Sequence, residues 1–355
     1  MEQKTINLAL QGGGAHGAFA WGVLDRLLQE PWLEIAAISG TSAGALNGAA
    51  LKAGLARHKG RPGRQAARDN LDYLWGEVGG MSDNRLIHWM CSMMPMPRGL
   101  QRWTELFSPA AWLEGMTRLF SPYDYGPLYV NPLGPLLREM PCPDFTNTRG
   151  PDLFVAATNV RSGRIRVFTG LEATRDAVMA SACLPTLFRA VEIPNPETGS
   201  LDAYWDGGYT GNPALFPLYR RDLPRDIVIV NINPLLRDTL PKSPADIADR
   251  VNEVSFNSSL MSELRAINFV KKLHAEGRLS DRAMKDPLIH MILDDALMND
   301  LSARSKMMPA CGLLERMRDA GRKAADRFLD DHADTLNVQD SVALPELLGD
   351  SGIVG

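Results

Sequence analysis

The sequence lacks the features that mark membrane-spanning and nucleic-acid-binding proteins. No uninterrupted apolar stretch reaches the roughly 18 residues of a transmembrane helix, because the apolar segment around residues 86–97 is broken by His88, Pro95 and Pro97. The formal net charge of −4 argues against a broad cationic face, so no nucleic-acid partner is expected. Any membrane contact is therefore expected to be local, apolar and transient.

Cysteine is scarce and widely spaced. The four cysteines, Cys91, Cys142, Cys183 and Cys311, form neither a CxxC pair nor a metal-ligand spacing, so we expect reduced, structural thiols and no bound metal. The start of the sequence also lacks an apolar stretch of roughly 7 to 15 residues behind a basic segment, which a secretory signal would need. These absences predict a cytoplasmic protein without a cofactor.

The composition is that of a globular protein, and an α/β pattern begins at once. The chain has 355 residues, enough for one large α/β domain or two smaller ones. Residues 6–10 read as a strand, 17–29 as an amphipathic helix, 34–39 as a second strand and 45–55 as a small-residue helix. Two strands joined by a helix form a parallel pair with a right-handed crossover, so both glycine-rich turns should open at the same edge of the sheet.

The rest of the chain predicts more strands and helices, with two segments of a different character. Residues 57–68 are basic and contain Gly and Pro, which favours an exposed excursion, while the Met and Trp residues of 86–122 suit an apolar lid or a buried helix. Alternating charges along 247–274 and 311–329 indicate a solvated surface or a subunit contact, so a homo-oligomer is an open alternative. We expect strands at 153–158, 165–168, 226–232 and 289–293, and helices at 134–140, 176–183, 247–274 and 311–329.

The pentad Gly40-Thr41-Ser42-Ala43-Gly44 fits the nucleophile elbow G-x-S-x-G. In such an elbow, glycines let a strand turn sharply into a helix and project the serine outward. Chance matches are common in a chain with 31 glycines. The position of this pentad, between a predicted strand and a predicted helix, nevertheless favours Ser42 as a nucleophile.

The hexapeptide Gly12-Gly13-Gly14-Ala15-His16-Gly17 also lies between a strand and a helix, so its amide N–H groups should form an anion site. It matches G-x-G-x-x-G as well, which makes a nucleotide-binding protein the alternative interpretation. A dinucleotide fold places an acidic residue at the end of its second strand. Here that end carries Ser39 to Ser42, while Glu34 stands at the beginning of the strand.

A nucleophilic serine needs a proton acceptor, and the six histidines of the sequence are poorly placed for that role. An α/β-hydrolase triad fits badly too, because its elbow follows several strands and Ser42 follows a single strand-helix unit. A carboxylate base remains, and the best candidate is Asp206 in Asp206-Gly207-Gly208, where glycines permit a turn that aims the side chain. Taken alone, Asp-Gly is chiefly a turn signal.

Together and in this order, the blocks Gly12 to Gly17, Gly40 to Gly44 and Asp206 to Gly208 resemble the three hallmark blocks of the patatin-like phospholipases. The stretch Ala180 to Pro185, with Phe188, is similar to the segment before the aspartate in bacterial members. The resemblance implies a three-layer α/β/α sandwich with a central, mostly parallel sheet. The patatin-like domain would cover residues 5–220. Residues 221–355 would add one strand and a mainly helical extension packed on the same domain.

The resemblance also implies the site. Ser42 would be the nucleophile and Asp206 the proton acceptor of a Ser-Asp dyad. The oxyanion hole would come from the backbone of Gly12, Gly13 and Gly14. The residues that support the motif geometry would be His16, Gly17, Gly40, Gly44, Gly207 and Gly208.

One departure from the family concerns His16, since many members carry Arg or Lys there. An ordinary imidazole titrates near pH 6.5, so a role in anion stabilisation would weaken above neutral pH. The other interpretation is a helix-entry residue that faces solvent. The expected activity is that of a lipid acyl hydrolase, of the phospholipase A, lysophospholipase or esterase kind, which cleaves carboxylic esters through an acyl-enzyme. A short-chain esterase or thioesterase is the alternative within this class.

Overall fold

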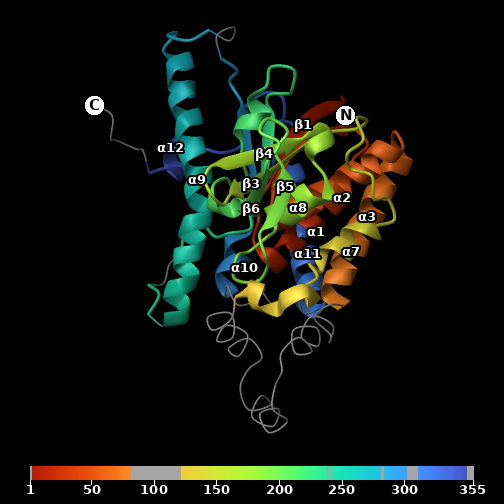
Figure 1. The fold of residues 1–355 in the computed structure, drawn as a ribbon. Helices are drawn as coiled ribbons and strands as arrows, with labels where there is room; N and C mark the ends of the chain where they lie inside the picture. The colour runs from red at the N-terminus through yellow and green to blue at the C-terminus, as the bar shows by residue number, and fades with distance from the viewer. Residues whose placement is uncertain are drawn as a thin grey trace.

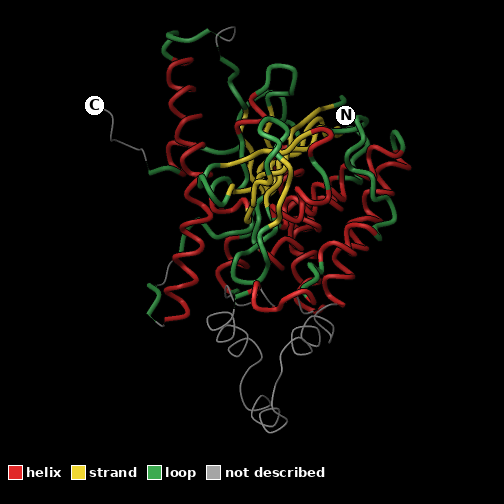
Figure 2. The backbone as a smooth tube through the Cα atoms, in the orientation of Figure 1, coloured by secondary structure: helices red, strands yellow, loops and turns green. Residues whose placement is uncertain are grey.

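The computed structural model describes residues 2–80, 121–237, 240–242, 244–280, 284–301 and 311–349. The trace in Figures 1 and 2 shows a central sheet with helices on both of its faces. The apolar segment that we expected to form a lid or a buried helix, 86–122, lies almost entirely outside the described residues. None of the described helices combines the length and the apolarity that crossing a membrane requires.

The described part of the chain forms an eight-stranded mixed sheet in which five neighbouring strands are joined by parallel pairing. Its order is β5-β6-β3-β2-β1-β7-β8, and β4 pairs with β3 outside this path. The pairs β1/β2, β2/β3, β1/β7 and β7/β8 are parallel, whereas β4 and β6 run antiparallel to β3, and β5 to β6. The strands are β1 (Lys4–Leu10), β2 (Leu33–Thr41), β3 (Asp152–Asn159), β4 (Ile165–Thr169), β5 (Val191–Pro194), β6 (Leu201–Asp206), β7 (Asp226–Val230) and β8 (Leu288–Ile292).

Helices cover both faces of this sheet, which confirms the expected three-layer α/β/α class. In Figure 1, α9 lies on one side of the sheet and α1, α2, α3 and α11 lie on the other. The α-helices are α1 (Gly17–Leu27), α2 (Ala43–Arg57), α3 (Arg61–Gly80), α7 (Leu133–Arg138), α8 (Arg175–Ser181), α9 (Pro244–Ala275), α10 (Asp295–Asp300), α11 (Cys311–His332) and α12 (Leu344–Leu347). Short 3-10 turns are η1 (Gly14–His16), η3 (Pro122–Leu128), η4 (Gly170–Glu172), η5 (Gly207–Tyr209) and η6 (Phe216–Tyr219).

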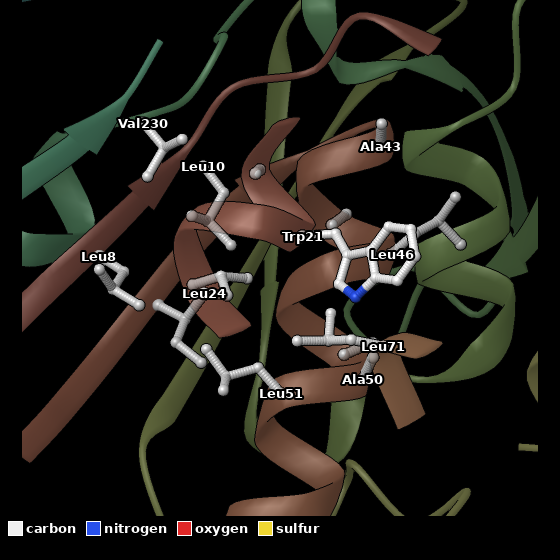
Figure 3. Close-up of a cluster of buried hydrophobic side chains, with 14 of the residues drawn as sticks. Leu8, Leu10, Trp21, Leu24, Ala43, Leu46, Ala50, Leu51, Leu71 and Val230 are labelled. Atoms are coloured by element: carbon white, nitrogen blue, oxygen red, sulfur yellow. The ribbon is translucent and has the colours of Figure 1, made fainter. Parts of the chain in front are cut away.

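The central strands are buried on both faces along most of their length, so apolar residues predominate in them. Successive side chains of a strand point to opposite faces. In β1, Leu8 and Leu10 therefore join the core beneath α1, α2 and α11, while Ala9 joins the second core beneath α9. Figure 3 shows the first of these cores, with Leu10 beside Val230 of β7 and Leu24 of α1.

The exposed excursion expected at 57–68 is confirmed for residues 57–62 and wrong for the rest, because α3 begins at Arg61 and continues to Gly80 with one side buried. Gly63 is buried, and a Cβ added there would lie 1.9 Å from the carbonyl oxygen of His58. Two of the basic residues, Arg64 and Arg68, are half-buried and bond to groups inside the fold. Arg68, for example, donates a 2.6 Å hydrogen bond to the buried carboxylate of Asp25. Glycine was here a sign of close backbone approach and not of a loop.

The C-terminal part packs into the same structure and gives the sheet β7 and β8, at the two strands expected for 226–232 and 289–293 and one more than the family-based division of the chain implied. Helix α11 packs closely on α1, since a Cβ on Gly22 would lie 1.9 Å from the carbonyl oxygen of Arg318. Asp25 of α1 also accepts a 2.7 Å hydrogen bond from Arg322 of α11. Residues on both sides of position 220 therefore share one sheet and one core.

Candidate active site

Strand β3 brings the two predicted dyad residues together. Strand β4 occupies one edge of β3, so β2 and β6 both bind the opposite edge and run toward each other along it. Thr41, the last residue of β2, pairs with Ala156, and Asp206, the last residue of β6, pairs with Ala157. Ser42 follows Thr41 directly, so the serine and the aspartate meet where the two strands end.

Ser42 sits on a strained elbow between β2 and α2. Its φ of 54° and ψ of −123° lie in a region that non-glycine residues rarely adopt. The glycines of the pentad are required by close packing, because a Cβ on Gly44 would lie 2.1 Å from the carbonyl oxygen of Leu10. On Gly40 it would lie 2.5 Å from the carbonyl oxygen of Gly44. The tight turn leaves the serine half-buried at the end of the parallel strands.

Asp206 is almost completely buried, with 1% of its surface exposed. Its Oδ1 accepts a 2.7 Å hydrogen bond from the Gly208 amide. Burial raises the pKa of the Asp206 carboxyl from 3.8 to about 6, and hydrogen bonding by the Ser42 hydroxyl and the Gly208 amide opposes this rise. Among the described residues, Oδ2 has no hydrogen-bond partner. One carboxylate oxygen is thus available for a proton.

Two residues that the sequence did not single out as site residues hold this pair in place. The amide of Ser42 donates a 2.9 Å hydrogen bond to the hydroxyl of Ser181, the last residue of α8. The amide of Asp206 donates a 2.8 Å bond to the carbonyl oxygen of Cys183. Both lie in the stretch that the sequence analysis matched to the family as a whole.

The cysteines whose side chains are described carry free thiols, as expected: Cys142 and Cys183 are both buried. Burial, together with the charge of Asp206, raises the pKa of Cys183 to about 12. A thiol with so high a pKa is not a nucleophile at neutral pH. Cys183 therefore does not compete with Ser42 for that role.

The glycine loop lies directly on Ser42 but differs from expectation at Gly12. A Cβ on Gly12 would be 2.6 Å from the Cβ of Ser42, so only glycine permits this approach. Its amide, however, donates a 2.6 Å hydrogen bond to Oδ1 of Asn212 and is therefore not directed at a substrate. Within the described residues, the amides of Gly13 and Gly14 donate no hydrogen bond to another protein group. The expected three-amide donor set is thereby reduced to two.

The remaining predicted residues also lie around the site. A Cβ on Gly17 would be 2.6 Å from the Cβ of Ala43, and one on Gly207 would be 2.2 Å from the carbonyl oxygen of Ala156. On Gly208 it would meet Oδ1 of Asp206 at 3.0 Å. His16 is buried, with 2% of its surface exposed, so the interpretation as a solvent-facing residue is wrong.

The structure gives no support to the nucleotide alternative. Glu34 pairs with Thr5 at the start of β1, whereas the glycine loop follows Leu10 at the other end of that strand. The acidic residue that would hold a ribose is therefore at the far edge of the sheet. Among the described residues, no group of three or more His, Cys, Asp or Glu side chains is arranged to hold a metal ion.

A mixed sheet between two helical layers, with a serine elbow at the ends of its parallel strands, defines a three-layer α/β/α protein. The family model of the patatin-like phospholipases matches residues 8–219, and the chain belongs to this family. Membership places it among the lipid acyl hydrolases.

Solved structures and curated proteins add less. The chain is similar to VipD from Legionella pneumophila at 16% sequence identity and a TM-score of 0.39, over 92% of this chain and 67% of that one. Among curated proteins, none matches the sequence significantly. The family assignment rests on the family model.

Proposed function

We propose that this protein hydrolyses carboxylic esters of lipids through a dyad of Ser42 and Asp206. The observation that carries the proposal is the meeting of β2 and β6 on one edge of β3, which places the strained serine beside a buried carboxylate with an unpartnered oxygen. The substrate class is that of a phospholipase A, a lysophospholipase or an esterase, and no cofactor takes part.

The reaction has two steps. In the first, Asp206 accepts the Ser42 proton while the serine oxygen attacks the acyl carbonyl carbon. The ester C–O bond then breaks, and the alcohol leaves with the proton from Asp206. In the second, Asp206 takes a proton from water, the hydroxide oxygen attacks the acyl-enzyme, and the serine regains its proton as the fatty acid leaves.

The negative charge that develops on the carbonyl oxygen needs fixed donors. The amides of Gly13 and Gly14 fill this role, since they lack protein partners and their loop contacts Ser42. Removal of one such donor lowers turnover about 100- to 1,000-fold in other hydrolases. His16, the last residue of η1, is buried close in sequence to these amides.

The direct test compares matched variants. Ser42→Ala and Asp206→Asn should each abolish hydrolysis of a p-nitrophenyl acyl ester, and Ser42→Ala should also abolish labelling by a fluorophosphonate. Ser162→Ala, on the exposed β3–β4 turn, and Asp202→Asn, on the same strand as Asp206, are the controls and should retain activity. Retained hydrolysis in either dyad variant would refute the assignment.

A panel of phospholipids, lysophospholipids, short-chain esters and thioesters then separates the substrate classes by mass spectrometry of the products. Preference for a thioester or a short-chain ester over every phospholipid would support that alternative within the class. Saturable binding of NAD or ATP, without fluorophosphonate labelling, would favour the nucleotide-binding alternative.

Contact with a lipid surface is part of the proposal and is supported by exposed apolar side chains on α9. Ile247, Val251 and Val254 are spaced by four and three residues, so they share one helical face, and all are exposed. Val251 and Val254 line a hollow of about 560 Å³ together with Tyr209, which is three residues beyond Asp206. Val251→Asp should reduce co-sedimentation with phosphatidylcholine vesicles, whereas the equally exposed Val338→Asp should not.

We extend the proposal to location and assembly. A cytoplasmic enzyme that meets membranes transiently agrees with the local character of the apolar surface on α9. A homo-oligomer would use the charged helix faces identified in the sequence, and the mass in solution, measured by light scattering, tests this directly.

A further inference from the structure

A cluster of buried amide side chains surrounds the first residue of the glycine loop. Gln11, Asn212 and Asn233 are completely buried, and Asn257 is 6% exposed. We call these four residues the amide cluster. They come from the end of β1, from the loop after η5, from the segment after β7 and from α9. A buried amide is costly unless its donors and acceptor are satisfied, so the hydrogen bonds of the cluster show what it holds.

Asn212 grips both polar groups of Gly12. Its Oδ1 accepts the 2.6 Å hydrogen bond from the Gly12 amide, and its Nδ2 donates to the Gly12 carbonyl oxygen at 3.2 Å. The Nδ2 of Asn233 donates to the same carbonyl oxygen at 2.9 Å. Gly12 offers one donor and one acceptor, so a side-chain amide matches it in a single orientation. The two peptide groups on either side of Gly12 are fixed as a result, and the second of them carries the Gly13 amide.

Gln11 extends these contacts to α9. Its Oε1 accepts hydrogen bonds from the backbone N–H groups of Ile232 at 2.8 Å and Asn233 at 3.0 Å. Its Nε2 donates a hydrogen bond to Oδ1 of Asn257 at 2.8 Å. Asn257 also donates from Nδ2 to the carbonyl oxygen of Pro234 at 3.1 Å. Asn257 of α9 thus orients the Gln11 side chain, which in turn binds the backbone of Ile232 and Asn233 after β7.

Helix α9 makes a second contact with the loop that carries Asn212. The backbone N–H of Asn212 donates a 3.0 Å hydrogen bond to the hydroxyl of Ser259, which lies two residues beyond Asn257 on α9. The family match ends at residue 219, and α9 begins at Pro244. Part of the support for the glycine loop therefore comes from outside the matched domain.

We propose that Asn212 is a positioning residue for the oxyanion loop, and that Asn257 makes α9 part of the catalytic unit by supporting the same loop. This inference rests on the proposed function, because it assigns no new chemistry but states what orients the Gly13 amide and, through it, the start of the turn that carries Gly14. Asn212 connects the two halves of the site, since it follows Asp206 by six residues and binds the loop that contacts Ser42. It contacts the loop backbone and not the reacting atoms.

The test measures kcat and KM for a soluble acyl ester in Asn212→Ala and Asn257→Ala, together with the rate of fluorophosphonate labelling of Ser42. Loss of the Asn212 grip should lower kcat and the labelling rate about 100-fold with KM little changed, because misdirected oxyanion donors affect the transition state more than the bound substrate. Asn257→Ala acts one step further away and should lower kcat about 10-fold. The double variant should be no slower than Asn212→Ala, since both act on one loop.

Asn70→Ala is the matched control. Asn70 is a completely buried asparagine of α3 that bonds the carbonyl oxygens of Ala50 and Cys142, remote from the loop. It should lose thermal stability as the two test variants do, yet retain kcat. A purely structural role for the cluster would give the same kcat in folded Asn212→Ala as in Asn70→Ala, and that result would overturn the inference.

The outcome is distinguishable from failure of the proposed function. If Ser42→Ala remains active, the dyad assignment fails whatever the asparagine variants do. If Ser42→Ala is inactive while Asn212→Ala turns over at the wild-type rate, the dyad stands and only the positioning role is refuted. Should Asn212→Ala not fold, Asn257→Ala alone decides the inference, with an unchanged kcat and labelling rate overturning it.

Discussion

Replacing Asp206 by asparagine should abolish activity and at the same time stabilise the protein. The carboxylate is buried without a cationic partner, and its pKa is raised from 3.8 to about 6. A raised carboxyl pKa means that the folded state prefers the protonated, neutral form. Ionisation of Asp206 therefore destabilises the folded protein as the pH rises from about 4 through 6, and the full cost applies above that range. Asparagine has nearly the same shape and never carries the charge.

The size of the effect follows from the two pKa values. A difference of one unit between the pKa of a group in the folded state and its pKa in the unfolded state corresponds to about 1.4 kcal/mol. A rise from 3.8 to about 6 therefore gives about 3 kcal/mol at pH 7.5, on the order of the desolvation cost expected for one buried carboxylate. Near pH 4 the folded state is almost fully protonated and the unfolded state is still about half protonated, so the gain should fall below about 1 kcal/mol.

The assay is thermal or denaturant unfolding of wild type and Asp206→Asn at pH 7.5 and near pH 4. We expect the variant to melt a few degrees higher at pH 7.5 and nearly together with the wild type near pH 4. Asp25→Asn is the contrasting variant. Asp25 is equally buried but is ion-paired with Arg68 and Arg322, so its replacement should lower stability at pH 7.5.

An Asp206→Asn variant that is no more stable than the wild type at pH 7.5, or whose gain does not depend on pH, would refute this reasoning. Either outcome would mean that the carboxylate is stabilised in the folded protein by groups other than the Gly208 amide and the Ser42 hydroxyl. The strain at Ser42 would then be the main cost of building the site.

Three further predictions follow from the same geometry. Only ionised Asp206 can accept a proton, so kcat/KM should increase about tenfold per pH unit up to about pH 6 and then level off; a profile flat from pH 4.5 to 8 would argue against Asp206 as the base. Gly207→Ala places a methyl group 2.2 Å from a backbone oxygen and should sharply reduce soluble yield and Tm, whereas Gly134→Ala, with its nearest neighbour 3.6 Å away, should behave like the wild type. Cys183 should resist iodoacetamide in the folded protein at pH 8 and react in urea, as peptide mass mapping can show, and rapid native labelling would contradict the raised pKa.

Much of the fold could be predicted because its apolar residues are strongly periodic. The strands of the parallel sheet are short apolar runs, and α1 repeats its buried residues every three or four positions, so both appear in a local window. The start of α3 could not be predicted in this way. Gly63 ordinarily interrupts a helix, and what overrides this is the close approach of α3 to the residues after α2, which is a tertiary contact. Strand β5 was also missed, since it is four residues long and half exposed.

The candidate site divides along similar lines. Ser42 and Asp206 lie in short motifs that glycines make visible, so sequence alone suggested both. Asn212 and Ser181 carry no such mark, because their importance depends on partners more than 100 residues away. Polar residues next to a buried apolar strand, such as Asn231 and Asn233 after β7, were the available signal. Even so, the sequence could not show that the Gly12 amide is already bonded.

The arrangement of β2 and β6 along β3 has a consequence for how this protein can change. Each half of the proposed dyad is fixed by its pairing with one of two successive residues, Ala156 and Ala157. The chain between β3 and β6 can therefore lengthen, shorten or exchange its surface loops while the distance between the reacting groups stays the same. A single-residue insertion within β3, in contrast, would turn one partner to the opposite face of the sheet. We therefore expect changes in substrate range to arise from changes in the connecting segments, while the length of β3 stays constant.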